Sequence, residues 1–385
     1  MEKSIPVARP LLGEEEAQAA RRAILSGWVV QGPEVAAFEE EFAAVVGAPY
    51  AVATSSGTAA LHLALMALDI GQGDEVLTVS HSFIATANAP RYVGATPVFV
   101  DVEPATGNLD ADQVARAISR RTRAIIAVHQ LGMPCNLESI LLVARDFNIK
   151  VVEDAACALG SEIRLPGRDW EPIGRPHGDL ACFSFHPRKV ITTGDGGMIT
   201  TADAKLKQRL ARLRTHSMSM SAAERHGAGK VVFEQYLELG YNYRLTDIQA
   251  AMGREQLKRL PGIIAARRHL AQRYLEALAD HPYLTLPQEP PYGRSNWQSL
   301  WITLTPQCPF SQTQVMEALL ARGIHTRRGV MCAHREPAYR HLPLRWPLPV
   351  SEYLQDHSII LPLYPDMTTA EQDRVITALK ECLKT

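Results

Sequence analysis

One lysine of this chain lies between two runs of residues with β-strand character. The segment LACFSFHPRKVITTGDGGMITT, residues 180–201, places Lys189 after the first run and before a glycine-rich turn that leads into the second. An amine held between two strands can form a Schiff base with an aldehyde cofactor. The lysine could also be exposed on a surface hairpin, and this segment alone favours that simpler interpretation.

A turn containing serine and glycine offers a place for a phosphate group. In VATSSGTAALHLAL, residues 52–65, a strand passes through Ser55, Ser56, Gly57 and Thr58 into a helix. Backbone N–H groups and the positive end of the helix dipole then point at whatever lies in front, and a phosphate is the natural occupant. A helix cap without a ligand is the alternative for so short a motif.

A carboxylate follows another apolar strand. KVVEDAACALG, residues 150–160, places Asp154 directly after that strand. A carboxylate at this edge can pair with a protonated pyridine nitrogen, which keeps the ring able to accept electrons from a carbanion. Asp154 could equally cap the following helix. Together with the lysine and the turn, it favours pyridoxal 5'-phosphate as the cofactor.

Three further side chains fit the same cofactor site. Ser184 precedes Lys189 by five residues, so its hydroxyl could bind the phosphate while the lysine reaches the aldehyde carbon. Phe83 in SHSFIATANA begins a helix after a strand, where an aromatic ring can lie against a flat cofactor. Core packing is a nearly equal alternative for Phe83. His186 could line the site, or be a hydrogen-bonded structural histidine.

Strands and helices alternate from about residue 50 onward. Repeated β-α-β units predict an α/β fold whose mostly parallel sheet is sandwiched by helices, with ligands at the carboxyl ends of the strands. Segments 161–179 and 217–230 are polar, and are expected to be loops or small hairpins. Strands are predicted at residues 50–55, 75–79, 97–102, 123–129 and 150–153, and helices at residues 58–68, 82–92, 110–118 and 137–147.

The chain changes character after Arg244. Two long helical patterns are separated by Pro261 and Gly262, and the second is expected to connect two domains. We predict a large cofactor-binding domain of residues 1–255 and a smaller C-terminal α+β domain of residues 256–385. The N-terminal segment is free to pack on the small domain.

Composition excludes several classes of protein. Forty basic residues balance forty-one acidic ones, and no long run has one sign, so nucleic-acid binding is not expected. The chain has neither a signal-peptide pattern nor a run of about 18 uncharged apolar residues, so no membrane span is expected and a cytoplasmic location is predicted. Six cysteines without a C-x-x-C pair argue against a metal site and against disulfides.

The longer motifs together resemble a known family. FSFHPRKVITTGDGG, VVEDAACALG, SSGTAALHLAL, SFIATANA, GYNYRLTDIQAAMG and SGWVVQGPEVAAFEEEF occur in the same order as in the sugar aminotransferases of the DegT/StrS type. These are pyridoxal-phosphate enzymes of fold type I, similar to aspartate aminotransferase. The resemblance covers nearly the whole chain.

The resemblance assigns roles to individual residues. It implies that Lys189 is the Schiff-base lysine and that Asp154 is the partner of the pyridine nitrogen. It places Phe83 at the stacking position, and implies a homodimer with shared active sites, because Asn242 matches an asparagine that reaches the cofactor phosphate of the neighbouring subunit. The residues that match the phosphate cradle are Ser56, Gly57, Thr58 and Ser184.

Two positions depart from the family pattern. Many members have Gln or His near the cofactor's phenolic oxygen, where this chain has Cys157, which puts that hydrogen bond in doubt. Many members also have Glu in the turn where this chain has Asp195, and we expect this change to matter little.

The resemblance implies transfer of an amino group from L-glutamate or L-glutamine to a keto-sugar nucleotide. The amino-sugar nucleotide would serve the synthesis of a cell-surface polysaccharide or a secondary metabolite. Arg327 and Arg328 in GIHTRRGVMCAH, with His334 close behind, lie where the family places part of its acceptor pocket. Arginine suits bidentate contact with phosphate. Two solvated arginines at a strand end are an equal alternative.

Other functions remain open. A related branch of the fold replaces the lysine by histidine and removes a sugar hydroxyl, and a further possibility is a regulator that binds the cofactor without turnover. Retention of Lys189 and Asp154 favours transamination, which needs both a movable base and an electron sink. A dinucleotide-dependent dehydrogenase is disfavoured because no G-x-G-x-x-G follows the first strand.

Overall fold

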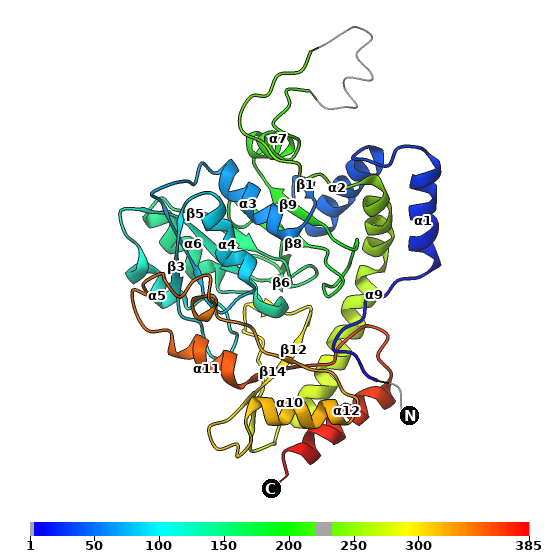
Figure 1. Cartoon of the computed structure of the whole chain (residues 1–385), viewed down its shortest axis with the longest axis vertical. Coiled ribbons are helices and arrows are strands. Elements are labelled where there is room, and N and C mark those ends of the chain that lie inside the picture. Colours follow the sequence, from blue (N-terminus) through cyan, green and yellow to red (C-terminus); the bar gives the residue numbers. More distant parts are fainter. Residues whose placement is uncertain (1–3, 221–232, 385) are drawn as a thin grey trace.

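A seven-stranded sheet forms the centre of the larger part of the molecule (Figure 1). The computed structural model describes residues 4–220 and 233–384 and orders the strands β1-β9-β8-β5-β4-β2-β3. β9 is antiparallel to both of its neighbours, and the other six strands are parallel to one another. The strands are β1 (Tyr50–Thr54), β2 (Glu75–Val79), β3 (Thr96–Val100), β4 (Thr122–Val128), β5 (Lys150–Asp154), β8 (Leu180–Ser184) and β9 (Gly197–Thr201).

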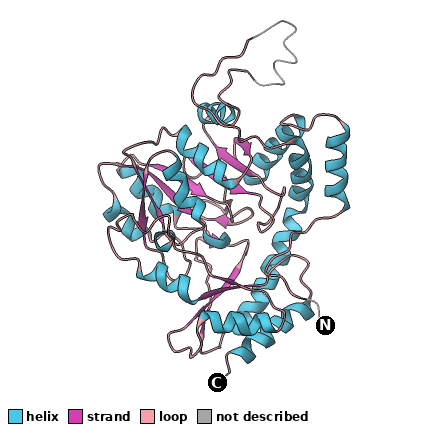
Figure 2. Ribbon diagram, in the orientation of Figure 1, coloured by secondary structure: helices cyan, strands magenta, loops and turns pink. Residues whose placement is uncertain are grey.

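Both faces of this sheet are covered. Every residue of β2 and of β9 is buried, as in strands that are packed on both faces. Figure 2 shows the helices gathered around the strands, and the mostly parallel sheet with its covering helices confirms the predicted fold class. The helices that pack against its strands are α2 (Pro33–Val46), α3 (Gly57–Ala67), α4 (Ile84–Tyr92), α5 (Ala111–Ala117), α6 (Leu137–Asp146) and α7 (Ala204–Leu213).

Helix α9 (Asp247–Leu278) runs uninterrupted from the larger part of the molecule into the smaller part (Figure 1). This corrects the expectation of two helices separated at Pro261 and Gly262. A proline inside a helix removes one hydrogen bond, but Leu260, Ile263 and Ile264 around it are buried, and this packing keeps the two halves continuous. The predicted domain boundary at residue 255 falls inside α9.

The N-terminal half of α9 also holds helices α1 (Glu14–Leu25) and α2 in place. Helix α1 packs along it. The carboxylate of Asp247 accepts hydrogen bonds from the N–H groups of Gly32 at 2.7 Å and of Val35 at 3.1 Å. The first turn of α2 is therefore capped by a residue that is distant in the sequence.

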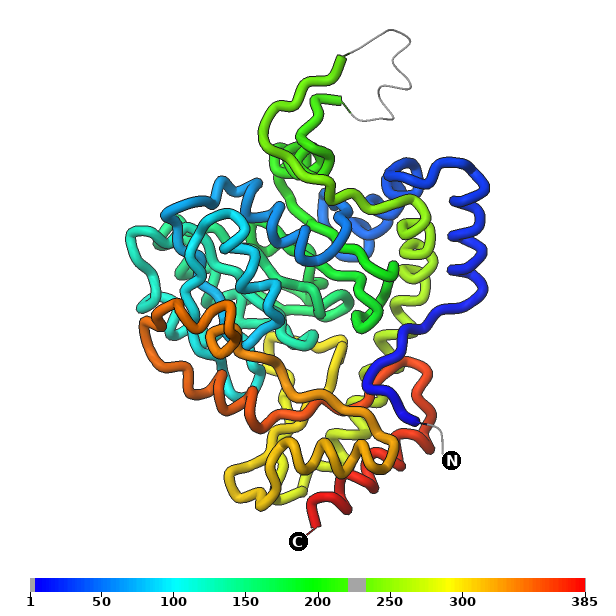
Figure 3. The backbone as a smooth tube through the Cα atoms, in the orientation of Figure 1, coloured from blue at the N-terminus to red at the C-terminus, as the bar shows by residue number. Residues whose placement is uncertain are grey.

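The smaller part is built on a four-stranded antiparallel sheet of order β10-β12-β14-β13. Its strands are β10 (Leu284–Thr285), β12 (Leu300–Leu304), β13 (Arg327–Arg328) and β14 (Ser358–Leu361), and helices α10 (Gln312–Ala321) and α12 (Thr369–Cys382) accompany it. Ile5 is buried in the apolar cluster of this part, and its N–H donates to Gly323 O at 2.9 Å. Figure 3 shows the N-terminal segment beside the C-terminal part.

The chain returns twice from the smaller part to the larger. Strand β11 (Gly293–Arg294) pairs with the hairpin of β6 (Glu162–Ile163) and β7 (Glu171–Pro172). The segment with the short helix η2 (Ala333–Arg335) and helix α11 (Pro349–His357) then crosses back, and Ser351 Oγ donates to Asp101 Oδ1 at 2.6 Å. No described helix combines the length and apolar character needed to cross a lipid bilayer.

Candidate active site at the carboxyl edge of the sheet

The turn before α3 and the end of β8 form one cradle. Ser56 is the N-cap of α3, and its Oγ accepts the N–H of Ala59 at 3.1 Å. Gly57 lies so close to β8 that an added Cβ would be 2.7 Å from Ser184 Cβ. The N–H groups of Gly57 and Thr58 find no acceptor among the described residues. They remain available to an anion, with Ser184 beside them.

Asp154 ends β5 and is 5% exposed. Its Oδ2 accepts the hydroxyl of Thr86 at 2.7 Å, and its Oδ1 accepts the N–H of Ala156 at 3.2 Å. Thr86 Oγ1 is itself 2.8 Å from Ser82 Oγ. Because the only hydroxyl proton of Thr86 goes to Asp154, Ser82 is the donor in that pair. This chain of hydrogen bonds fixes the orientation of the carboxylate.

Lys189 lies in the loop between β8 and β9, and its side chain is half-buried. Its Nζ is 3.0 Å from Cys157 Sγ, and Cys157 follows Asp154 by three residues. The fold therefore brings Lys189, Cys157 and Asp154 to one edge of the sheet, where the parallel strands β5 and β8 are neighbours.

A segment of the smaller part holds both sides of this edge in place. Asn296 Nδ2 donates to the carbonyl oxygens of Cys157 at 2.8 Å and Leu159 at 2.9 Å. Gln298 Nε2 donates to the carbonyl oxygen of Arg188 at 2.6 Å. Residues 296–298 thus determine how the loop of Lys189 lies against the end of β5.

Phe83 and Asn242 both lie at the surface of the chain. Phe83 is the N-cap residue of α4 and is 59% exposed, which excludes ordinary core packing. Asn242 is exposed and pairs with Thr215 in an isolated β-bridge. Its neighbour Tyr243 accepts the N–H of Ser55 at 2.8 Å, so the Asn242 segment adjoins the phosphate turn of its own chain.

His186 is half-buried beside Ser184. Burial lowers its pKa, and the positive charge of Arg188 acts in the same direction. Its Nδ1 accepts the N–H of Arg188 at 3.2 Å. The imidazole therefore favours the neutral form and has one ring nitrogen left for a ligand.

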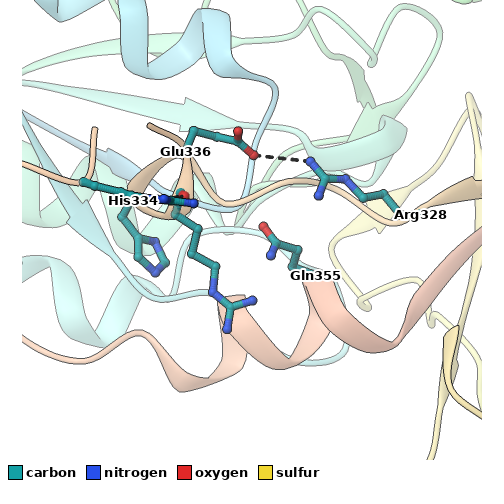
Figure 4. Close-up of a pocket in the computed structure, with 6 residues that line it drawn as sticks. Arg328, His334, Glu336 and Gln355 are labelled. Carbon is teal, nitrogen blue, oxygen red and sulfur yellow. Dashed lines mark hydrogen bonds and ion pairs between the residues drawn. The ribbon is translucent and has the colours of Figure 1, made fainter. Parts of the chain in front are cut away.

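Arg328 and His334 line a polar cavity of about 660 Å³ beside α11 (Figure 4). Arg328 forms an ion pair with Glu336 at 3.3 Å. His334 Nδ1 lies 2.7 Å from Ser80 Oγ, and its Nε2 lies 3.1 Å from Glu352 Oε1, so both of its ring nitrogens have partners. Arg327 is exposed on β13. The other residues lining the cavity are Arg335, Glu336, Arg340 and Gln355.

Sequence reasoning missed Thr86, Ser82, Asn296 and Gln298. Thr86 lies in the SFIATANA motif, so a hydroxyl side chain three residues after Phe83 was the available signal. Asn296 and Gln298 occur in a segment without a recognisable motif, and only the tertiary structure connects them to the site.

The geometry is that of an α/β enzyme with a half-buried lysine, a buried carboxylate and, in the part of the chain that the structure describes, unpaired backbone N–H groups at one edge of its sheet. The chain belongs to the DegT/DnrJ/EryC1/StrS aminotransferase family, which matches residues 10–380. It is a transaminase of the sugar aminotransferase type, and the family depends on pyridoxal phosphate.

Solved structures of similar proteins agree with this assignment. DesV of S. venezuelae, solved in complex with a ketimine intermediate, is 32% identical, with 100% of each chain covered and a TM-score of 0.89. PseC of Helicobacter pylori, an aminotransferase involved in the biosynthesis of pseudoaminic acid, is 25% identical, with 99% of each chain covered and a TM-score of 0.89. The PLP form of the putative sugar aminotransferase Spr1654 of Streptococcus pneumoniae is 26% identical, covering 99% of this chain and 100% of that one, with a TM-score of 0.87.

Proposed function

We propose that this enzyme uses pyridoxal phosphate, held at Lys189, to move an amino group from L-glutamate or L-glutamine to a keto-sugar nucleotide. The observation that carries the proposal is the contact of Lys189 Nζ with Cys157 Sγ at 3.0 Å, three residues past the buried Asp154. It puts a movable amine beside the segment that directly follows the carboxylate at the end of β5, and transamination uses two such groups.

The residues present fit the cofactor. The N–H groups of Gly57 and Thr58 have no acceptor among the described residues, and with the hydroxyls of Ser56 and Ser184 they could bind a phosphate. Gly57 allows this turn to pack closely on β8, because an added Cβ would lie 2.7 Å from Ser184 Cβ. Pyridoxal phosphate, when bound, supplies a ring that stores the electron pair released at the substrate carbon.

The protein side chains supply positioning and proton transfer. Asp154 holds the proton on the pyridine nitrogen, and the hydroxyl of Thr86 fixes the direction of that carboxylate. Lys189 would hold the cofactor through its aldehyde carbon and would serve as the base that moves a proton at the substrate carbon. Phe83 supports one face of the ring. Cys157 lies beside Lys189 and would adjoin the cofactor there.

Part of the site comes from a second copy of the chain. Asn242 is exposed, and the segment before it carries large apolar side chains that are exposed in the single chain. Exposed apolar patches of this kind mark interaction surfaces. We therefore infer a homodimer in which Asn242 reaches the phosphate held by the partner. The exposed side chains are Phe233 (87%), Tyr236 (63%), Leu237 (55%) and Leu239 (74%).

The acceptor is proposed to be a nucleotide-linked keto-sugar. Arg327 and Arg328 offer cations for its diphosphate, and His334, which lines the same cavity as Arg328, and His186 are proposed to contact the substrate. The predicted polar stretch 217–230 lies largely outside the described residues. The amino-sugar nucleotide would supply polysaccharide or secondary-metabolite synthesis in the cytoplasm.

The proposal is tested by reducing the purified protein with borohydride after adding pyridoxal phosphate. The cofactor label is expected on the peptide that contains Lys189, and Lys189→Arg protein should carry none. Label at another lysine would overturn the assignment of the site. A matched control is Lys150→Arg, which should leave the label on Lys189. Lys150 begins β5, at the end opposite Asp154, and its Nζ is 2.9 Å from Asp179 Oδ1.

A second measurement addresses the reaction class. Keto-sugar nucleotides are screened with L-glutamate while 2-oxoglutarate is measured. Release that depends on the nucleotide supports aminotransfer to a sugar. Loss of a sugar hydroxyl without 2-oxoglutarate would support the dehydratase alternative, and cofactor uptake without conversion to the pyridoxamine form would support a regulator.

A further inference from the structure

A thiol and the amine of the site are in direct contact. Cys157 Sγ and Lys189 Nζ are 3.0 Å apart, and both side chains are half-buried, so a small polar reagent can reach them. Among the described residues, no other cysteine has a lysine amine at hydrogen-bonding distance. Two potential nucleophiles, a thiol and an amine, are therefore in contact at this site.

The same short segment restrains both members of the pair. Asn296 Nδ2 donates to Cys157 O at 2.8 Å, and Gln298 Nε2 donates to Arg188 O at 2.6 Å. Gln298 N–H in turn donates to Asn296 Oδ1 at 2.8 Å, which links the two anchors. Because the partners are held opposite each other, the effective concentration of the amine at the sulfur is high.

We propose that Cys157 and Lys189 form an oxidative modification site, in which a peroxide produces a covalent nitrogen–sulfur bond between them. In the first step the Cys157 sulfur attacks hydrogen peroxide; the O–O bond breaks, the sulfur is oxidised by two electrons to a sulfenic acid, and water leaves. In the second step the Lys189 ammonium gives one proton to solvent, and the neutral amine attacks that sulfur with its lone pair; the S–O bond breaks, and one N–H proton leaves with the hydroxide as water.

The product is a sulfenamide, and it consumes the amine. Sulfenic acids condense in this way with backbone nitrogen, and a neutral amine, which is a stronger nucleophile than an amide nitrogen, lies at contact distance here. A dithiol reverses the bond by attacking the sulfur, which releases the amine and the thiol and leaves the dithiol as a disulfide. The chemistry needs a peroxide and a Lys189 amine that is free of the cofactor's aldehyde, and it does not depend on the proposed sugar substrate.

Cys382 provides a matched internal control. Its Sγ lies 3.2 Å from Arg322 Nη1 and its side chain is also half-buried. An arginine guanidinium stays protonated and has no free electron pair for attack. Peroxide should therefore oxidise Cys382 without cross-linking it, although its geometry is similar.

The experiment uses the full-length protein, treated with hydroxylamine to remove any aldehyde from Lys189 and then dialysed. After hydrogen peroxide and alkylation of the remaining thiols, a non-reducing digest is analysed by mass spectrometry. We expect one species that joins the Cys157 and Lys189 peptides, lighter than their sum by two hydrogen atoms, and we expect dithiothreitol to remove it. Cys157→Ser and Lys189→Arg should each abolish it.

Two results would overturn the inference. One is conversion of Cys157 to sulfinic acid in the wild-type protein while the Lys189 peptide stays unmodified. The other is an unreacted Cys157 at a peroxide concentration that oxidises Cys382. Circular dichroism of the two variants shows whether they are folded, and the wild-type digest decides the question without them.

Discussion

At the residue scale, the hydroxyl of Thr86 fixes the orientation of the Asp154 carboxylate at the end of β5. Thr86 is 1% exposed and Asp154 is 5% exposed, so the bond between them is shielded from water. A hydrogen bond to a buried charged group contributes about 1.5–3 kcal/mol. The direction in which Asp154 points should therefore depend on this one side chain.

Thr86→Val keeps the shape of the side chain and removes the hydroxyl. We expect turnover to fall by about tenfold or more, with a shifted absorbance band of the bound cofactor, because Asp154 is left with a single N–H donor. Thr86→Ser should restore both properties. The measurements are single-turnover rates with L-glutamate and the visible spectrum.

Thr78→Val is the control for Thr86→Val. Thr78 is equally buried, on β2, but its hydroxyl donates to Ile126 O at 3.1 Å and not to the site. Similar losses of turnover and similar spectra in the two valine variants would show that the effect is one of general stability.

That Lys189 lies near the end of β5 could be predicted in part from the sequence, because Asp154 ends β5 and Lys189 lies in the loop that follows the neighbouring parallel strand β8. Each β-branched run is bounded by polar residues, so β2 was predicted at its observed bounds and β5 within one residue. Asn296 and Gln298 could not be predicted, because their partners are backbone carbonyl groups. Backbone groups leave no residue-type signal in the sequence.

At the element scale, α9 shows how tertiary packing overrides local propensity. Pro261 and Gly262 are typical of a helix end, and the sequence therefore predicted two helices. Buried apolar residues on both sides of the pair keep the helix continuous instead. The continuity matters for the site, because Arg267 of α9 donates to the carbonyl oxygen of Gln298 at 3.0 Å and Gln249 near its start donates to that of Asp195, in the loop of Lys189, at 2.7 Å.

Two glycines of α9 should respond oppositely to substitution by alanine. An added Cβ at Gly262 meets no atom within 4 Å, so Gly262→Ala should stabilise the protein by about 0.5–1 kcal/mol. At Gly253 the Cβ would lie 2.7 Å from Phe38 Cζ, so Gly253→Ala should destabilise it by about 1–3 kcal/mol. Urea unfolding measures both, and equal shifts would contradict the packing described for α9.

Buried side chains that can carry charge link β5 to the segment after β4 and to the segment before β8. Glu153 is 0% exposed, and its Oε1 accepts the N–H groups of His177 at 3.0 Å and Gly178 at 2.9 Å. His129 Nδ1 accepts the N–H of Cys135, so its Nε2 carries the proton and donates to Glu153 Oε2 at 3.2 Å. These hydrogen bonds hold the pKa of Glu153 well below its usual range despite burial.

His177 makes the stability of this region depend on pH. Burial lowers its pKa, but Glu153 and Glu171 outweigh burial and raise it above 6.5. A raised pKa means that the stabilisation is complete below pH 6.5 and is lost as pH rises through the folded value. The free energy of unfolding should therefore fall over this window, and His177→Gln should flatten that slope. His341→Gln, at an exposed position, is the control.

At the scale of the whole molecule, the site lies where the two parts of the chain meet. Residues 296–298 from the smaller part hold Cys157 and Arg188. Ala333 N–H donates to Ser80 O at 2.9 Å, next to the segment that leads to Phe83. Changes in how the two parts pack would therefore alter the position of Lys189 relative to Asp154.

A shared active site can be tested by mixing two inactive variants. Lys189→Ala removes the amine, and Asn242→Asp places a negative charge where we propose contact with the partner's phosphate. If Asn242 serves the neighbouring subunit, each mixed dimer contains one site with both native residues. Random reassembly should then recover roughly a quarter of wild-type activity per chain.

Each variant alone should stay inactive after the same unfolding and refolding, which controls for reversion and contamination. If Asn242 instead serves its own chain, every site in a mixed dimer lacks one of the two residues, and no activity returns. The exposed Asn242 and the large apolar side chains at residues 233–239 favour the first outcome, because a second copy of the chain would cover both. Steady-state rates of the mixture against the mixing ratio distinguish the two cases, since complementation peaks at equal amounts.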